Sequence, residues 1–80
     1  MKIYEYTGKK NSQNIEHGTP FLIIGFCDGE WELSETNWND VENNHDAIQY
    51  SHNNLLVDYS IKDDDFKKYF KFNCEIAERI

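Results

Sequence analysis

The clearest hydrophobic pattern in the chain is an apolar run and an alternating run separated by Asp28 and Gly29, FLIIGFC-DG-EWELSE. An Asp-Gly pair between two such runs predicts a β-hairpin with a type I′ turn, because both central residues of that turn need a positive φ. The run before the turn is apolar at consecutive positions. We therefore expect it to form a central strand that is covered on both faces.

A two-residue turn also predicts the register of this hairpin. The expected pairs are Cys27 with Glu30, Phe26 with Trp31, Gly25 with Glu32, Ile24 with Leu33 and Ile23 with Ser34. Because side chains alternate between the faces of a strand, one face of the hairpin is predicted to form the core. That face would carry Leu22, Ile24, Phe26, Trp31 and Leu33. The other face would carry Phe21, Ile23 and Cys27 with Glu30, Glu32 and Ser34.

Weaker patterns predict the other strands. Residues 2–6 (KIYEY) indicate a first strand, and a polar loop is expected from there to Pro20. One helical turn is expected after Thr36, which is a favourable N-cap residue. Residues 47–50 and 55–61 are predicted to form a second hairpin.

The segment SIKDDDFKKYFK predicts a short helix that begins at Ser60. Ser60 and Asp63 resemble a capping box, and Asp63 or Asp64 is the alternative cap. Aspartates in the first turn and lysines in the last turn complement the helix dipole. The expected i,i+4 pairs are Asp63–Lys67 and Asp64–Lys68. Successive aspartates point about 100° apart on a helix, so we do not expect them to share one metal ion.

The last residues fit two patterns. A helical stripe would continue through Phe70 and Cys74, whereas Phe72, Cys74 and Ile76 lie on a period of two. The cleaner alternation favours a short helix followed by a final strand. Because 80 residues leave no room for two cores, we expect a single domain over residues 1–80. Its predicted class is α+β, with a small antiparallel sheet of four to five strands and one short helix near the C-terminus.

The sequence contains no catalytic or metal-binding motif. The three histidines and two cysteines form no C-x-x-C or H-x-x-x-H pair. An EF-hand loop starting at Asp40 would place His45 where glycine is required. Glu30 and Glu32 are one pleat apart, but so short a chain has little room for the enclosed cleft that paired-carboxylate chemistry needs. We therefore expect no enzyme, no cofactor and no bound metal.

Two further features concern the environment of the protein. No run of about 18 apolar residues exists, so no membrane span is expected. The first residues, MKIYEYTGKK, do not resemble a signal peptide. A cytoplasmic protein is predicted, in which Cys27 and Cys74 are free, buried thiols, and a single disulfide between them is the alternative for an exported protein.

The distribution of charge is the strongest functional signal. The net charge is −7, but residues 1–10 carry +2 and residues 62–80 carry zero. The 51 residues between them contain no Lys or Arg and carry −9. On this count, the aspartates at 63–65 are neutralised by neighbouring lysines. A solvated surface explains a net charge of this size, but it does not explain so long a stretch without a cation.

A field of one sign repels nucleic acid and membranes and attracts basic partners. Carboxylates two residues apart on a strand lie about 6.6 Å apart, which is of the order of the spacing of phosphates along a nucleic-acid strand. We therefore expect a protein-binding inhibitor whose acidic face occupies the basic surface of a nucleic-acid-handling protein. Antagonists of host defence encoded by phage or mobile elements are of this kind.

The predicted face has one aromatic anchor, Trp38, and seven acidic residues. Its members are Asp28, Glu30, Glu32, Glu35, Trp38, Asp40, Glu42 and Asp46. Trp31 or Tyr50 is expected to add apolar contact, and Trp38 fits equally well as a loop residue folded over the sheet edge. The alternative function is a structural or assembly module that forms a homodimer through an exposed strand edge or serves as an accessory subunit.

Overall fold

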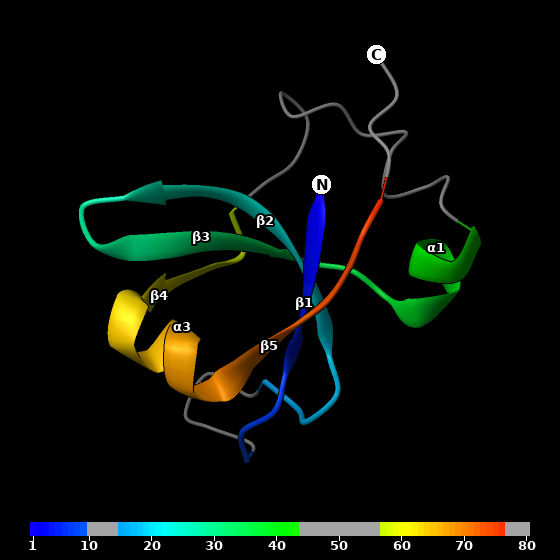
Figure 1. Ribbon diagram of the computed structural model, residues 1–80, viewed down its shortest axis with the longest axis horizontal. Helices are drawn as coiled ribbons and strands as arrows, with labels where there is room; N and C mark the ends of the chain where they lie inside the picture. The colour runs from blue at the N-terminus through cyan, green and yellow to red at the C-terminus, as the bar shows by residue number, and fades with distance from the viewer. Residues whose placement is uncertain (10–14, 44–56, 77–80) are drawn as a thin grey trace.

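The computed structural model describes residues 1–9, 15–43 and 57–76. Within these ranges it contains five strands and two helices (Figure 1). They are β1 (Lys2–Tyr6), β2 (Pro20–Cys27), β3 (Glu30–Glu35), α1 (Trp38–Asn43), β4 (Tyr59–Lys62), α3 (Asp63–Tyr69) and β5 (Phe70–Glu75). The predicted α+β class, with an antiparallel sheet and a short helix near the C-terminus, is confirmed.

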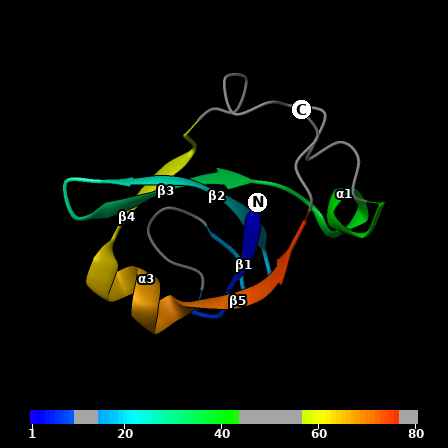
Figure 2. The same ribbon diagram turned by 45° about the horizontal axis from the view of Figure 1, so that its top comes forward.

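All five strands belong to one antiparallel sheet, in the order β4-β3-β2-β1-β5. The strands β4 and β5 are the two edges of this sheet. They are nevertheless connected by α3 alone, which begins at the residue after β4 and ends at the residue before β5. Seven helical residues span only about 10 Å, whereas the edges of a flat five-stranded sheet lie about 19 Å apart. The sheet must therefore curl, and α3 ties its two edges together at one end (Figures 1 and 2).

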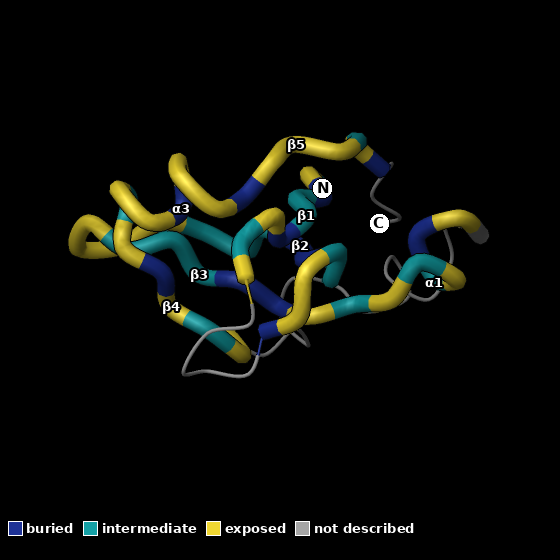
Figure 3. The backbone as a smooth tube through the Cα atoms, turned by 90° about the horizontal axis from the view of Figure 1, so that it is seen from below, coloured by how far each residue is buried: buried dark blue, intermediate teal, exposed yellow. Residues whose placement is uncertain are grey.

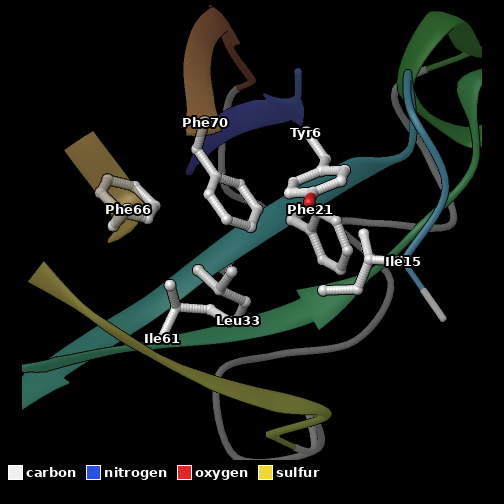
Figure 4. Close-up of a cluster of buried hydrophobic side chains, with 7 residues drawn as sticks. All are labelled: Tyr6, Ile15, Phe21, Leu33, Ile61, Phe66 and Phe70. Atoms are coloured by element: carbon white, nitrogen blue, oxygen red, sulfur yellow. The ribbon is translucent and has the colours of Figure 1, made fainter. Parts of the chain in front are cut away.

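One buried cluster fills the inside of this curl (Figure 4). Each strand and α3 contribute to it, as does the segment before β2, and its members are Tyr6, Ile15, Phe21, Leu33, Ile61, Phe66 and Phe70. The ring of Phe21 lies at its centre, 5.6 Å from the ring of Phe70 and 5.7 Å from that of Tyr59. A smaller cluster of Ile3, Leu22, Val41 and Ile76 covers the opposite face of the sheet.

The predicted turn of the β2–β3 hairpin is confirmed. Asp28 has a φ of 53° and Gly29 a φ of 79°, as a type I′ turn requires. The first three predicted pairs are also confirmed, namely Cys27 with Glu30, Phe26 with Trp31 and Gly25 with Glu32. The strand β2 lies in the middle of the sheet, as its apolar character on both faces predicts.

Beyond Gly25 the predicted register is wrong, because a β-bulge lies between Ile23 and Gly25. Leu33 pairs with Ile23 rather than with Ile24, and Ser34 pairs with Leu22 rather than with Ile23. A bulge adds one residue to one strand and reverses the alternation of faces beyond it.

The predicted faces are consequently wrong for part of β2. Phe21 and Ile23 pack in the main cluster, whereas Leu22 lies in the cluster on the opposite face. Phe26 still shares a face with Trp31, since their rings are 4.7 Å apart.

The helix near the C-terminus begins later than predicted. Ser60 lies in β4, and α3 begins at Asp63, with Lys62 as an N-cap residue that makes no side-chain capping bond. The neighbouring Ile61 is buried and pairs with Trp31, so β4 continues to Lys62. Because Ser60 is then a strand residue, the predicted capping box does not form. The final strand after the helix is confirmed as β5.

Two more predicted elements border or overlap residues 44–56, which lie outside the described residues. The helical turn expected after Thr36 is confirmed as α1, but the side chain that caps it is that of Asn37 rather than of Thr36. Of the predicted second hairpin, residues 47–50 lie outside the described residues. The part at residues 55–61 contributes β4, which pairs with β3.

Candidate functional site

The residues predicted to form one acidic face do not lie together. Asp28, Glu30 and Glu32 lie at the turn end of the β2–β3 hairpin, Glu35 ends β3, and Asp40 and Glu42 lie on α1. The turn and α1 are at opposite ends of the molecule in Figure 1, whose longest dimension is 32 Å. Charges separated by more than about 8 Å are largely screened at physiological salt. The two acidic groups therefore act separately, and Asp46 lies outside the described residues.

The α1 end of the molecule uses its predicted site residues in structural contacts. Trp38 is half-buried against the smaller cluster, and its Nε1 donates a hydrogen bond to the carbonyl of Gly18 at 2.8 Å. Asn37 caps α1, and its side chain is held in place by Asp40. The Asn37 amide donates to the Asp40 carboxylate, and the Asp40 backbone N–H donates to the Asn37 side-chain oxygen, both at 2.8 Å.

The fold instead brings a second acidic segment to the hairpin turn. The backbone N–H of Asp63, the first residue of α3, donates to the carbonyl of Gly29 at 3.1 Å. The indole Nε1 of Trp31 donates to Asp63 Oδ1 at 2.9 Å. These two bonds hold the start of α3 against the turn. The resulting acidic corner consists of Asp28, Glu30, Asp63, Asp64 and Asp65.

Two lysines lie among these five carboxylates. Lys67 Nζ is 3.0 Å from Asp63 Oδ2, and Lys62 is the register partner of Glu30. The predicted Asp64–Lys68 pair is not formed, because Lys68 Nζ lies over the ring of Tyr69, 5.3 Å from its centroid.

In the described part of the chain, Asp64 and Asp65 make no ion pair, and both are exposed. The predicted neutralisation of the three aspartates is confirmed for Asp63, which pairs with Lys67, but Asp64 and Asp65 have no such contact among the described residues. Even with Lys68 counted beside Lys62 and Lys67, five carboxylates outnumber three lysines, so the acidic corner keeps an excess of negative charge. From the sequence, the triple aspartate predicts only the first turn of a helix, and that turn is confirmed. Its significance depends on a contact between Asp63 and Gly29, which lie 34 positions apart.

The pKa of Asp63 is held below its ordinary value of 3.8, first by the hydrogen bond from Trp31 and then by the contact with Lys67. The same contact with Asp63 raises the pKa of Lys67. A carboxyl group whose pKa is lower in the folded state stabilises the fold above its unfolded-state pKa. That contribution is lost as the pH falls through the folded-state value.

We expect the free energy of unfolding to fall more steeply below about pH 4 in the wild type than in Asp63→Asn, because asparagine does not titrate. Urea unfolding at a series of pH values, followed by tryptophan fluorescence, measures this difference. Asp65→Asn is the matched control on the same helix and should keep the wild-type pH dependence. An Asp63→Asn variant with the wild-type dependence would contradict the assignment.

The two cysteines are free thiols, as predicted. Cys27 is exposed rather than buried, because it is the last residue before the turn. Its Sγ lies 3.7 Å from Asp28 Oδ2, to which it donates a weak hydrogen bond. Cys74 on β5 is half-buried.

The carboxylates of the acidic corner spread over a surface rather than converge. Within residues 1–9, 15–43 and 57–76, no three His, Cys, Asp or Glu side chains are grouped so that they could hold a metal ion. In the same ranges, no helix has the length and apolar character needed to cross a membrane. No family model, curated protein or solved structure matches the chain. Function is therefore inferred from the corner and its surroundings.

Proposed function

We propose that the protein is a binding protein whose acidic corner occupies a basic surface of another protein. The observation that supports this function most directly is the seating of Asp63 on Gly29, which joins two acidic segments into one surface. Exposed carboxylates that spread over a surface suit a partner with several Lys or Arg side chains. Such charges act mainly on the rate and orientation of association.

The partner in this proposal is a protein that handles nucleic acid, because a protein surface that binds phosphates carries clustered Lys and Arg side chains. Occupying it would exclude the nucleic acid and inhibit the partner. In this proposal the protein belongs to the class of small acidic antagonists that phage and mobile elements encode. It has no catalytic role and does not itself bind nucleic acid.

The experiment that tests this function compares two charge-reversal variants of equal net charge. Asp64→Lys with Asp65→Lys changes the corner, and Glu35→Lys with Glu42→Lys changes exposed acids away from it. Each protein is immobilised and used to capture partners from host lysate at low and at high salt. We expect wild type and the Glu35/Glu42 variant to retain the same basic partners at low salt and to release them at high salt. The corner variant should not capture them.

Lysines in the first turn of a helix oppose its dipole and cost about 0.3–1 kcal/mol each, so circular dichroism must show that the corner variant is folded. Asp64→Asn with Asp65→Asn is the milder version and should weaken capture in the same direction. Partners captured equally well by the corner variant, or retained at high salt, would contradict the proposal.

An assembly module remains the second candidate function, because β5 is an edge strand with an exposed phenylalanine, Phe72. A free edge can pair with the same edge of a second copy. The exposed Lys71 beside Phe72 opposes such pairing, because charged edge residues block it. Light scattering discriminates between the two candidates, since a stable homodimer favours the assembly module and a monomer favours the binding protein.

A further inference from the structure

Five aromatic side chains form a continuous row from the hairpin to the opposite edge of the sheet. We call Phe26, Trp31, Phe66, Tyr4 and Phe72 the aromatic row. Each of the first three pairs of neighbouring rings in the row has a centroid distance of 4.7 Å, and the last pair, Tyr4 and Phe72, has a centroid distance of 5.6 Å. The row joins β2, β3, α3, β1 and β5.

Only the two ends of the row lie clear of the core, since Phe66 belongs to the main buried cluster and Trp31 and Tyr4 pack against it. Phe66, in the middle, is 4% exposed, but the two ends, Phe26 and Phe72, are 52% and 47% exposed. Trp31 and Tyr4 are half-buried. In α3, Phe66 is buried and Asp63 is half-buried, and the other residues are exposed, as the colours of Figure 3 show along the helix. Phe26 and Phe72 are therefore exposed aromatic rings backed by the core, and aromatic side chains are enriched among the residues that anchor interfaces.

The charges around the row differ between its two ends. At the hairpin end, Phe26 and Trp31 lie on either side of the turn segment that carries Asp28 and Glu30. The indole of Trp31 also donates a hydrogen bond to Asp63. At the other end, Phe72 lies next to Lys71, whose register partner on β1 is Glu5. One end of the row therefore adjoins the acidic corner, whereas the other end is balanced in charge.

We propose that the aromatic row binds an extended segment of a partner protein that carries an apolar side chain next to Lys or Arg. The apolar side chain packs on an exposed ring, and the cations lie at the hairpin end, against the carboxylates of the acidic corner. The carboxylates attract these cations and orient the segment along the row. This inference rests on the proposed function and specifies the partner of that same site: it binds through dry contact as well as charge.

Two synthetic peptides of equal length and charge test this inference. The first peptide alternates lysine with serine along its whole length. The second peptide has the same lysines, but leucine replaces serine in one half of its length. Binding is followed by fluorescence in a Trp38→Phe background, which leaves Trp31 as the one tryptophan. We expect the leucine peptide to bind about tenfold more tightly than the serine peptide, because burial of one leucine supplies that difference.

Single substitutions in the protein then show which side chains give the leucine peptide its higher affinity. Phe26→Ser and Phe72→Ser should each reduce the advantage of the leucine peptide and leave the binding of the serine peptide unchanged. Val57→Ser is the matched control, since Val57 is an exposed apolar residue outside the row, and it should preserve the advantage.

The outcomes separate this inference from the proposed function. Equal binding of the two peptides, or an advantage that survives both phenylalanine substitutions, overturns the role of the row and leaves the acidic corner supported. Failure of both peptides to bind overturns the proposed function together with this inference. A homodimer in light scattering that Phe72→Ser dissociates would show that a second copy occupies the row, and it would also overturn the inference.

Discussion

Phe21→Ala is expected to remove about 3–5 kcal/mol of stability, the range measured for large aromatic residues in tightly packed cores. Phe21 is fully buried, and its ring meets those of Tyr59 on β4 and Phe70 on β5, which belong to the two edges of the sheet. The cavity would therefore open where the curled sheet closes on itself. A domain of this length has a total stability of about 4–12 kcal/mol, so the loss is a large share of the whole.

Chemical denaturation with urea, followed by circular dichroism, measures this effect. Phe26→Ala is the matched control, because it removes the same side chain from the same strand at a position that is 52% exposed. It should cost about 1 kcal/mol or less. Equal losses for the two variants would mean that Phe21 is not the centre of the core.

Phe66→Ala is expected to cost a similar amount, about 3–5 kcal/mol, and to release α3 from the sheet. Phe66 is the buried residue of this helix, and its ring stacks 4.7 Å from that of Trp31 and 5.3 Å from that of Phe70. Without these contacts, the hydrogen bond from Trp31 to Asp63 remains as the main side-chain link between hairpin and helix. The acidic corner should therefore lose its geometry before the whole domain unfolds.

The local effect is measured by the emission of Trp31 in the Trp38→Phe background, which should shift to longer wavelength as the indole becomes more exposed to water. Tyr69→Ala, at an exposed position of the same helix, is the control and should leave the emission and the stability nearly unchanged. If Phe66→Ala keeps the wild-type emission, Phe66 does not hold α3 in place.

Much of the fold can be predicted from short sequence signals. Asp28-Gly29 alone identifies the turn, its positive φ angles and the first three residue pairs. The bulge next to Ile24 leaves no such signal, because an extra residue inside a uniformly apolar run does not disturb its hydrophobic pattern. Ser60 was misassigned for a related reason, since a residue suited to cap a helix also fits the exposed face of a strand. Ile15, buried in the core from a polar segment, carries no periodic signal either.

The candidate site was harder to predict than the fold. Glu30 and Glu32 can be placed near the turn from their spacing alone, but Glu35 and Glu42 share only their charge with them and lie elsewhere. Asp64 and Asp65 belong to the site because α3 docks on the turn, and that contact follows from the curl of the sheet rather than from local sequence. Charge counted along a chain therefore indicates that an acidic surface exists, but not where it forms.

The pairing of Met1 with Ile76 has a practical consequence for how this protein can be handled. The amino group of Met1 donates to the carbonyl of Ile76 at 2.7 Å, and the N–H of Ile76 donates back at 2.8 Å. This clasp lies at the far end of β5 from α3, about 20 Å away for a strand of six residues. A fusion partner or surface tether attached beside Met1 would therefore lie away from α3 and leave its exposed carboxylates accessible to solvent.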